Sequence, residues 1–362
     1  MKDFSIFTIQ RQYHLTQDFT DADEKDVKSQ LKKICDYLSQ NNIVCIYCKV
    51  FLQNTALLQD LVIELKQSGQ DPIVIPLEYP SVTGSVMSGI NIFGIHNDEL
   101  EKFAHNTEYD MDFVCYSYKG FKYFHGMHLF QDNDTAFANC QLMLSRYDFK
   151  PTSLIRTWYY LNQIHKFYPE FNKSRNRFFD KNNIRYDKHS AHLPASTCIE
   201  GSYLGSHLMH LYAVDLSDRR ATKTRIYNIS QSEADGDQYL FQPAFSRGML
   251  TDYCYSKELQ ISGTASVGAD GKSQYVNDAY QQLKTSLCYV TDLLQDAGML
   301  WEHLCECTMF FADASLYQQL DQACDEVNIK RPNGISVIGH VCRKDLLFEI
   351  DGIAKKACEK LK

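Results

Sequence analysis

Ionisable side chains are densest in one short part of this 362-residue chain, the segment 340–351 (HVCRKDLLFEID). Its apolar positions predict a β-strand, on which side chains alternate between two faces, so Glu349 and Asp351 are expected on one face. Two carboxylates held close together raise the pKa of one of them, which keeps a carboxylic acid protonated near neutral pH. The pattern therefore indicates a general acid in this pair. The alternative is an edge strand whose charges are solvated.

Arginines in apolar or aromatic surroundings could bind an anionic substrate, and three such residues are Arg156, Arg175 and Arg247. An arginine buried alone is costly, so each must be paired or face a polar cleft, and its planar fork can bind a carboxylate through two hydrogen bonds. On a strand, Arg156 shares a face with Trp158 and Tyr160, which suits a flat ring that carries carboxylates. The alternative for any single arginine is an ion pair with a glutamate across a repeat boundary.

The thirteen cysteines alone predict no metal site and no disulfide framework. Cys45 and Cys48 have the spacing of a metal or redox pair, but a separation of three residues on a strand puts them on opposite faces. Cys342, by its residue type, is expected to be a buried small hydrophobic residue. Its neighbour Arg343 could lower the thiol pKa, but on a strand it points to the other face.

One supersecondary unit recurs three times along the chain. The last copy has predicted helices at 278–297 and 315–327 and strands at 303–311, 334–342 and 345–353. The middle copy has helices at 135–147 and 166–179, strands at 153–161 and 207–215, and the segment 194–201 between them. The first copy has helices at 24–38 and 55–67 and strands at 43–51 and 73–77. Opening strands are expected at 258–268 and within 113–129.

These units predict an α/β (α+β) architecture of three pseudo-repeats around a common axis, because packing them together buries all of their apolar helix faces. The expected domains are residues 1–112, 113–220 and 221–362. The middle copy has no carboxylate at the position equivalent to Glu349, as expected if one copy carries the site. The alternative is two unrelated α+β domains.

The composition is that of a globular protein with a formal net charge of −8, from 37 Lys and Arg against 45 Asp and Glu. Without a basic stripe, a general nucleic-acid surface is not expected. The sequence has no signal peptide and no apolar run of about 18 residues, so we expect a cytoplasmic protein that does not enter membranes. An anionic small substrate fits this charge only if the positive site is local.

Six segments in order resemble the chorismatases, which lie within the wider Rid (YjgF) superfamily. They are RTWYYL (156–161), YPEFNKSRNRFF (168–179), PASTCIEG (194–201), FSRGM (245–249), ISGTASVG (261–268) and CRKDLLFEIDGIA (342–354). The resemblance implies YjgF-like units with a chorismate-mutase-like fold, and an enzyme that releases pyruvate from chorismate. No cofactor is implied, and the protein is expected as a pseudo-trimeric monomer or a small homo-oligomer.

By the same resemblance, Glu349 matches the catalytic glutamate, which protonates the enolpyruvyl ether. Cys342 matches the cysteine that marks the members that form 3-hydroxybenzoate, with 4-hydroxybenzoate as a further product. The implied substrate-binding residues are Arg156, Tyr160, Arg175, Arg247 and Arg343.

Two other functions stay open. A Rid-type imine deaminase or a small-molecule-binding protein is one, although the arginine typical of those deaminases has no counterpart in 334–336. An RNA-associated protein is the other, which the net negative charge disfavours.

Overall fold

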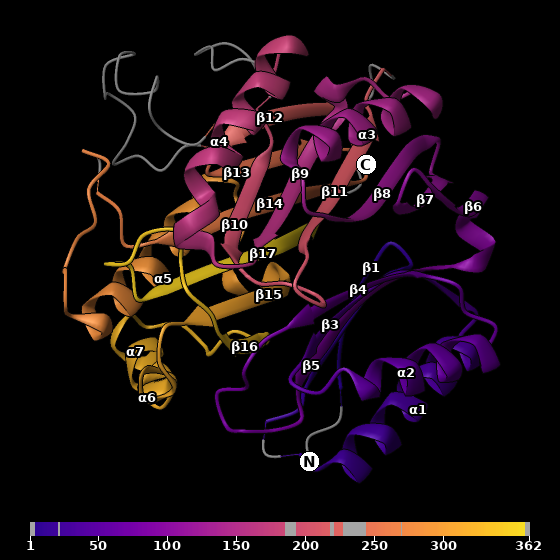
Figure 1. Cartoon of the computed structure of the whole chain (residues 1–362). Coiled ribbons are helices and arrows are strands. Elements are labelled where there is room, and N and C mark those ends of the chain that lie inside the picture. Colours follow the sequence, from indigo (N-terminus) through magenta and orange to yellow (C-terminus); the bar gives the residue numbers. More distant parts are fainter. Residues whose placement is uncertain are drawn as a thin grey trace.

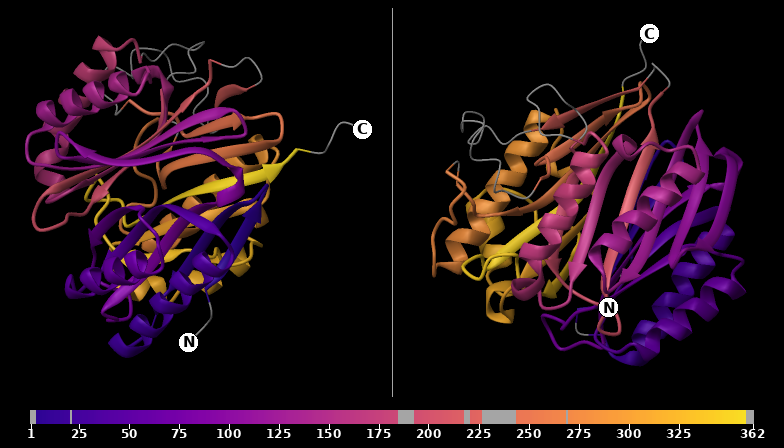
Figure 2. Two further views of the ribbon diagram at one scale, coloured as in Figure 1. Left: turned by 90° about the vertical axis from the view of Figure 1, so that its right-hand side faces the viewer. Right: turned by 45° about the horizontal axis from the view of Figure 1, so that its top comes forward.

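The computed structural model describes residues 4–20, 22–184, 193–217, 221–226, 244–268 and 270–358. Three β-sheets face one another, and the helices of each unit cover the outer face of its own sheet (Figure 1). Two further views show the three groups of helices on three different sides of the molecule (Figure 2). Among the described residues, no helix has the length and apolar character that a bilayer-spanning segment needs.

The first unit has five strands in the order β1-β2-β5-β3-β4. Its elements are β1 (Ser5–Ile9), β2 (Gln12–Asp18), α1 (Glu24–Gln40), β3 (Ile43–Leu52), α2 (Ala56–Gln67), β4 (Ile73–Glu78) and β5 (Met87–His96). A 3₁₀ turn, η1 (Asn97–Glu99), leads to the second unit.

The second unit has six strands in the order β10-β9-β11-β8-β7-β6. Its elements are β6 (Leu100–Glu108), β7 (Met111–Tyr118), β8 (Phe121–Phe130), α3 (Asn133–Arg146), η2 (Pro151–Ser153), β9 (Leu154–Leu161), α4 (Ile164–Lys181), β10 (Ala195–Glu200) and β11 (His207–Asp215). Strand β6 belongs to this sheet because it pairs with β7, although it precedes residue 113.

The third unit has six strands in the order β12-β13-β14-β17-β15-β16. Its elements are β12 (Thr222–Ile226), β13 (Gly248–Asp252), β14 (Ser256–Ala265), α5 (Ala279–Asp296), η5 (Trp301–His303), β15 (Leu304–Phe311), α6 (Ala314–Tyr317), α7 (Leu320–Glu326), β16 (Ile335–Ile338) and β17 (Phe348–Ala357).

All three units share one connectivity, which confirms the predicted repeat. In each, a strand of a hairpin leads to a helix, then a strand, a second helical segment and a parallel edge strand, namely β4, β10 or β16. The last strand, β5, β11 or β17, returns to the middle of its sheet and runs antiparallel to both neighbours. The predicted helix 315–327 is divided into α6 and α7, and the predicted strand 334–342 ends at Ile338 as β16.

Helix α5 shows how the sequence specifies these elements. The Asp278 side chain accepts a hydrogen bond from the Gln281 N–H and so caps the first turn. Leu283, Leu287 and Val290 recur at helical spacing and are buried against the sheet. The helix ends before Gly298, whose φ of 68° is the left-handed conformation that glycine adopts most easily.

The inner faces of the three sheets share one apolar cluster. Phe51 of β3, Tyr160 of β9 and Phe310 of β15 each lie one residue before the end of their strand, and all three belong to this cluster. Separate clusters between each sheet and its own helices complete the core. The inner faces therefore pack against one another, and a polar group on them needs a partner on its own sheet or on one of the other two.

The prediction that Cys45 and Cys48 lie on opposite faces of their strand was wrong. A β-bulge in β3 between Cys45 and Tyr47 shifts the alternation by one residue, so both cysteines pack in the cluster under the helices of the first unit. The same bulge turns Tyr47 to the inner face, where the side chain of Lys49 also reaches Glu306 of the third unit.

Candidate active site

The boundary between the second and third units brings most of the predicted site residues together. Strand β10 is the edge of its own sheet and lies beside β14 of the next unit. The Glu200 N–H donates to the His340 carbonyl (2.9 Å), and the Ser196 N–H donates to Oγ of Ser262 (2.8 Å). These bonds bring the PASTCIEG segment against the strands that carry the ISGTASVG and FEID segments.

Glu349 lies on β17 with its side chain almost fully enclosed, since the residue is 5% exposed. A β-bulge in β14 between Ile261 and Thr264 leaves Gly263 against its carboxyl group. A Cβ atom added at Gly263 would lie 2.0 Å from Oε1 of Glu349, so only glycine leaves room for this side chain.

The pKa of Glu349 is raised to about 8, mainly by burial and then by the nearby charge of Asp351. The positive charges of Arg247 and Arg156 act in the opposite direction but do not outweigh these two causes. Burial thus raises the pKa of Glu349 more than the charge of Asp351 does. The sequence pattern had suggested the charge of Asp351 as the cause. At neutral pH this side chain carries its proton.

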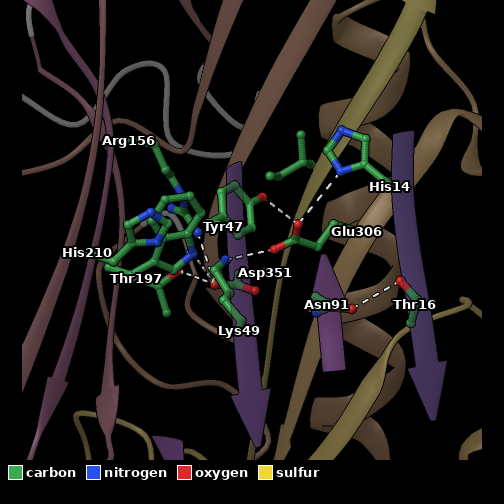
Figure 3. A network of polar contacts seen from close by, with 12 residues as sticks. His14, Thr16, Tyr47, Lys49, Asn91, Arg156, Thr197, His210, Glu306 and Asp351 are labelled. Carbon is green, nitrogen blue, oxygen red and sulfur yellow. Dashed lines mark hydrogen bonds and ion pairs between the residues drawn. The ribbon is translucent and has the colours of Figure 1, made fainter. Parts of the chain in front are cut away.

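Asp351 accepts three hydrogen bonds from the second unit at a single oxygen, Oδ2. The donors are Nη2 of Arg156 (3.0 Å), Nε1 of Trp158 (3.1 Å) and Oγ1 of Thr197 (2.7 Å). Arg156 is fully buried, and Figure 3 shows it beside Asp351 and Thr197. Arg156 and Trp158 therefore share the inner face of β9, as predicted. Arg156 also forms an ion pair across the unit boundary, as in the alternative stated for it, but its partner is an aspartate and not a glutamate.

Buried guanidinium groups in this region keep hydrogen-bond donors that are not used. Among the described residues, Nε and Nη1 of Arg156 and Nε of Arg175 are buried without a partner. A buried donor without an acceptor costs about 1–3 kcal/mol, and more when the group is charged. Such donors would be satisfied by an anionic ligand.

Arg175 projects from α4 into the aromatic layer of the second unit. Its Nη2 donates to Oδ1 of Asn172 (2.7 Å), and its guanidinium lies 5.7 Å from the ring centre of Phe171. Its charge also acts on the thiols of Cys198 and Cys342, on which Glu349 acts as well, so Arg175 faces the unit boundary near Glu349.

Cys342 lies in a bend after β16 and not on a strand, so the predicted alternation with Arg343 does not apply. Burial raises the pKa of the Cys342 thiol to about 11, with a further contribution from Glu349, while a hydrogen bond with Tyr168 acts in the opposite direction. The thiol is therefore neutral at physiological pH, and it lies close to the proposed acid.

The three remaining predicted residues have different surroundings. Arg247 is half-buried, and its charge reaches Glu349. Tyr160 is buried on the inner face of β9, where Asp351 and Arg156 act on its hydroxyl. Nη1 of Arg343 donates to the Gly271 carbonyl (2.7 Å), so this arginine holds the loop after β14.

A second polar cluster on the inner faces was missed by the sequence analysis. Glu306 accepts hydrogen bonds from Nζ of Lys49 (2.7 Å) and the hydroxyl of Tyr47 (2.6 Å), and Nδ1 of His14 lies 3.7 Å away. Figure 3 shows the four side chains converging on one point from the first and third units. The sequence repeat could have pointed to this cluster. A shift of 150 residues aligns Leu154 with Leu304 and Arg156 with Glu306, so two units carry a charged residue at the same position of an otherwise apolar strand.

No protein-family model matches this chain, and no curated protein matches it. Among solved structures, a chorismatase crystal structure at 1.08 Å resolution aligns over 97% of this chain and 99% of its own, with a TM-score of 0.63 and 13% identity. This chain has the chorismatase fold. The resemblance found in the six sequence segments is thus confirmed for the chorismatase fold.

Single-unit proteins of the Rid type also match in part. TdcF of E. coli, solved with bound serine, is 22% identical over 37% of this chain and all of its own, with a TM-score of 0.28. The Rid-family protein YyfA of Yersinia pestis is 21% identical over 37% of this chain and 98% of its own, with a TM-score of 0.30.

Proposed function

We propose that this protein is a chorismatase that releases pyruvate from chorismate and forms 3-hydroxybenzoate. The observation that carries the proposal is a buried carboxylic acid, Glu349, which is protonated at neutral pH and lies at a boundary lined by arginines with unused donors. A dianionic substrate with an acid-sensitive enol ether needs both a proton donor and guanidinium groups. The chorismatase fold over nearly the whole chain supports the same activity.

In the proposed reaction, Glu349 donates its proton to the terminal methylene carbon of the enolpyruvyl ether, which creates an oxocarbenium ion. Cleavage of the bond between the ring and the ether oxygen then releases pyruvate, while the oxygen of the neighbouring ring hydroxyl bridges to the vacated carbon. Opening of this bridge with loss of one proton, which returns to Glu349, gives the aromatic 3-hydroxybenzoate. Chorismate has the same atoms as pyruvate and hydroxybenzoate taken together, so the reaction needs no oxidant, reductant or organic cofactor. A buried position suits this step because exclusion of water keeps the acid protonated until the substrate binds.

The substrate carboxylates are proposed to bind the arginines around Glu349. Arg156 and Arg175 offer unused donors, and the charge of Arg247 reaches the acid directly. Tyr160 would supply an aromatic wall, and Arg343 would act through the loop that it holds.

Cys342 is proposed to direct the product toward the hydroxybenzoates. Its neutral thiol occupies the side of the site that Tyr168 and Arg175 also approach. A side chain of this size beside the reacting ring would leave less room for water, which favours aromatisation over addition of water.

The test is an assay of the purified chain with chorismate, in which pyruvate is measured with lactate dehydrogenase and NADH. The wild type is expected to oxidise NADH in proportion to the chorismate supplied, and Glu349→Gln is expected to do so at least about 100-fold more slowly. Chromatography of the wild-type reaction should then show 3-hydroxybenzoate. A wild-type chain that releases no pyruvate would refute the proposed function.

A further inference from the structure

A buried glutamine that lies outside the reacting groups connects the two loops next to Glu349. Gln282 lies on α5, and the residue is 0% exposed. Its Nε2 donates to the carbonyls of Tyr275 (3.2 Å) and Asp345 (2.8 Å), and its Oε1 accepts from the Leu347 N–H (2.7 Å). Both N–H donors and the oxygen of this amide are therefore used, and all three partners are backbone groups.

The first of these loops follows β14, the strand that carries Gly263. Besides the bond from Gln282 to Tyr275, it is held by Arg343, which donates to the Gly271 carbonyl (2.7 Å). The hydroxyl of Tyr289 donates to Oε1 of Gln274 in the same loop (2.9 Å).

This first loop borders the site of the proposed acid. Burial raises the pKa of Tyr289, and among the smaller causes Tyr275 raises it further while Arg247 lowers it. Arg247 also acts on Glu349, so the loop lies beside the arginine that reaches the acid.

The second loop leads from Cys342 directly into β17. Gln282 holds this loop at the Asp345 carbonyl and at the Leu347 N–H. Leu347 is two residues before Glu349, so a change in the position of its backbone moves the acid as well.

We propose that Gln282 is a positioning residue for the Glu349 acid: by joining the two loops, it keeps water away from that side chain and fixes the strand that carries it. This inference rests on the proposed function of Glu349 as a proton donor. A purely structural role would stabilise α5 and the loops without affecting when the acid loses its proton.

The test compares Gln282→Met, which keeps the length of the side chain without its polar atoms, with Ser286→Ala on the next turn of α5. Ser286 is equally buried, but its Oγ donates only to the Gln282 backbone carbonyl (2.8 Å), so its loss leaves both loops untouched. For Gln282→Met we expect kcat to fall about 10- to 100-fold with little change in KM, because a displacement of about 1 Å can cost that much. For Ser286→Ala we expect kcat to be unchanged.

A readout independent of turnover separates this inference from the proposed function. The carboxyl ¹³C shift of Glu349 is titrated with pH and assigned by its absence in Glu349→Gln. In Gln282→Met the titration midpoint should move to lower pH, because water that reaches the carboxyl group removes part of the burial effect. In Ser286→Ala it should match the wild type. Circular dichroism checks that each variant is folded.

Gln282→Leu serves as a second variant, because it also removes all three hydrogen bonds, adds no charge near Glu349 and differs from methionine in shape. It is expected to shift the midpoint in the same direction. If Gln282→Met and Gln282→Leu keep the wild-type midpoint, the positioning role is wrong. A wild-type chain without pyruvate release would refute the proposed function, whereas the titration would still decide whether Gln282 protects the acid.

Discussion

Two buried glutamates on neighbouring strands of the third sheet have opposite protonation states. Glu306 on β15 is 3% exposed and Glu349 on β17 is 5% exposed, so burial does not distinguish them. Burial alone would raise the pKa of Glu306, but Lys49 and His14 outweigh it and hold this pKa well below the usual range. The pKa of Glu349 rises to about 8.

The difference lies in what the other units bring to each carboxyl group. The first unit provides a lysine and a tyrosine hydroxyl to Glu306. Among the described residues, no hydrogen bond to the Glu349 carboxyl is found, and Asp351 adds a like charge beside it. Glu306 is thus an anion whose partners join two units, whereas Glu349 keeps its proton at neutral pH and can donate it.

The comparison predicts its largest effect for Glu349→Gln. Loss of a general acid costs about 10²- to 10⁴-fold in kcat, and glutamine has nearly the same shape, so the fold should be retained. Pyruvate release is measured beside the thermal unfolding of the same sample at pH 7. A Gln variant with wild-type turnover would remove Glu349 from the mechanism.

The same substitution at Glu306 should have the opposite consequence, a loss of stability. Glu306→Gln leaves Lys49 buried without a carboxylate, and breaking a buried ion pair costs about 3–5 kcal/mol. Denaturant unfolding of the variant and the wild type measures this difference. Equal stability would mean that the ion pair contributes nothing to joining the units. Activity per folded molecule should fall far less than in Glu349→Gln.

Gly263→Ala should impair proton donation by Glu349 without changing any ionisable group. The added methyl group would meet the Glu349 carboxyl, so we expect that side chain to move and kcat to fall about 10- to 100-fold. Gly94→Ala is the control, because its methyl group would meet Ile43 in the first unit (2.6 Å), far from Glu349 in the chain. If both variants lose activity equally, the loss comes from general damage to packing.

The structural features that lie within single units could be predicted from the sequence. Alternation on strands placed Arg156 with Trp158 on one face, and helical periodicity located most helices to within a few residues. These features depend on neighbouring residues, whose geometry is regular.

The contacts between units could not be predicted in the same way. Lys49 and Glu306 are 257 residues apart, and their contact depends on how two sheets pack. The bulge in β3 that turns Tyr47 inward leaves no mark in the apolar pattern, and it also made the prediction for Cys45 and Cys48 wrong. Gly263 and Gln282 were missed because their roles depend on the side chains and loops that they meet.

The pH dependence should separate the two glutamates further. An acid with a pKa of about 8 is protonated below that pH, so kcat/KM should hold up to about pH 8 and then fall about tenfold per pH unit. Because this folded-state pKa lies above the ordinary value of 4.5, the stability that Glu349 contributes is complete below about pH 4.5 and is lost as the pH rises through 8.

The midpoint of thermal unfolding, measured at several pH values, tests this predicted loss of stability. Glutamine cannot ionise, so Glu349→Gln should gain stability relative to the wild type between pH 6 and pH 9. A difference between the two proteins that does not change with pH would contradict the raised pKa.

Cys342→Ala should have the smallest effect, a change in product at nearly unchanged rate. The thiol is neutral and lies close to Glu349, so its removal takes away volume and leaves the proton donor in place. A water molecule that enters the space would add to the ring before it becomes aromatic, and chromatography should show more of the non-aromatic dihydroxy acid beside 3-hydroxybenzoate. Cys198→Ala is the matched control, because this thiol is also close to Arg175 and Glu349 but lies on the opposite side of the unit boundary. If the two variants give the same products, position at the boundary does not matter and Cys342 has no special influence on the ring.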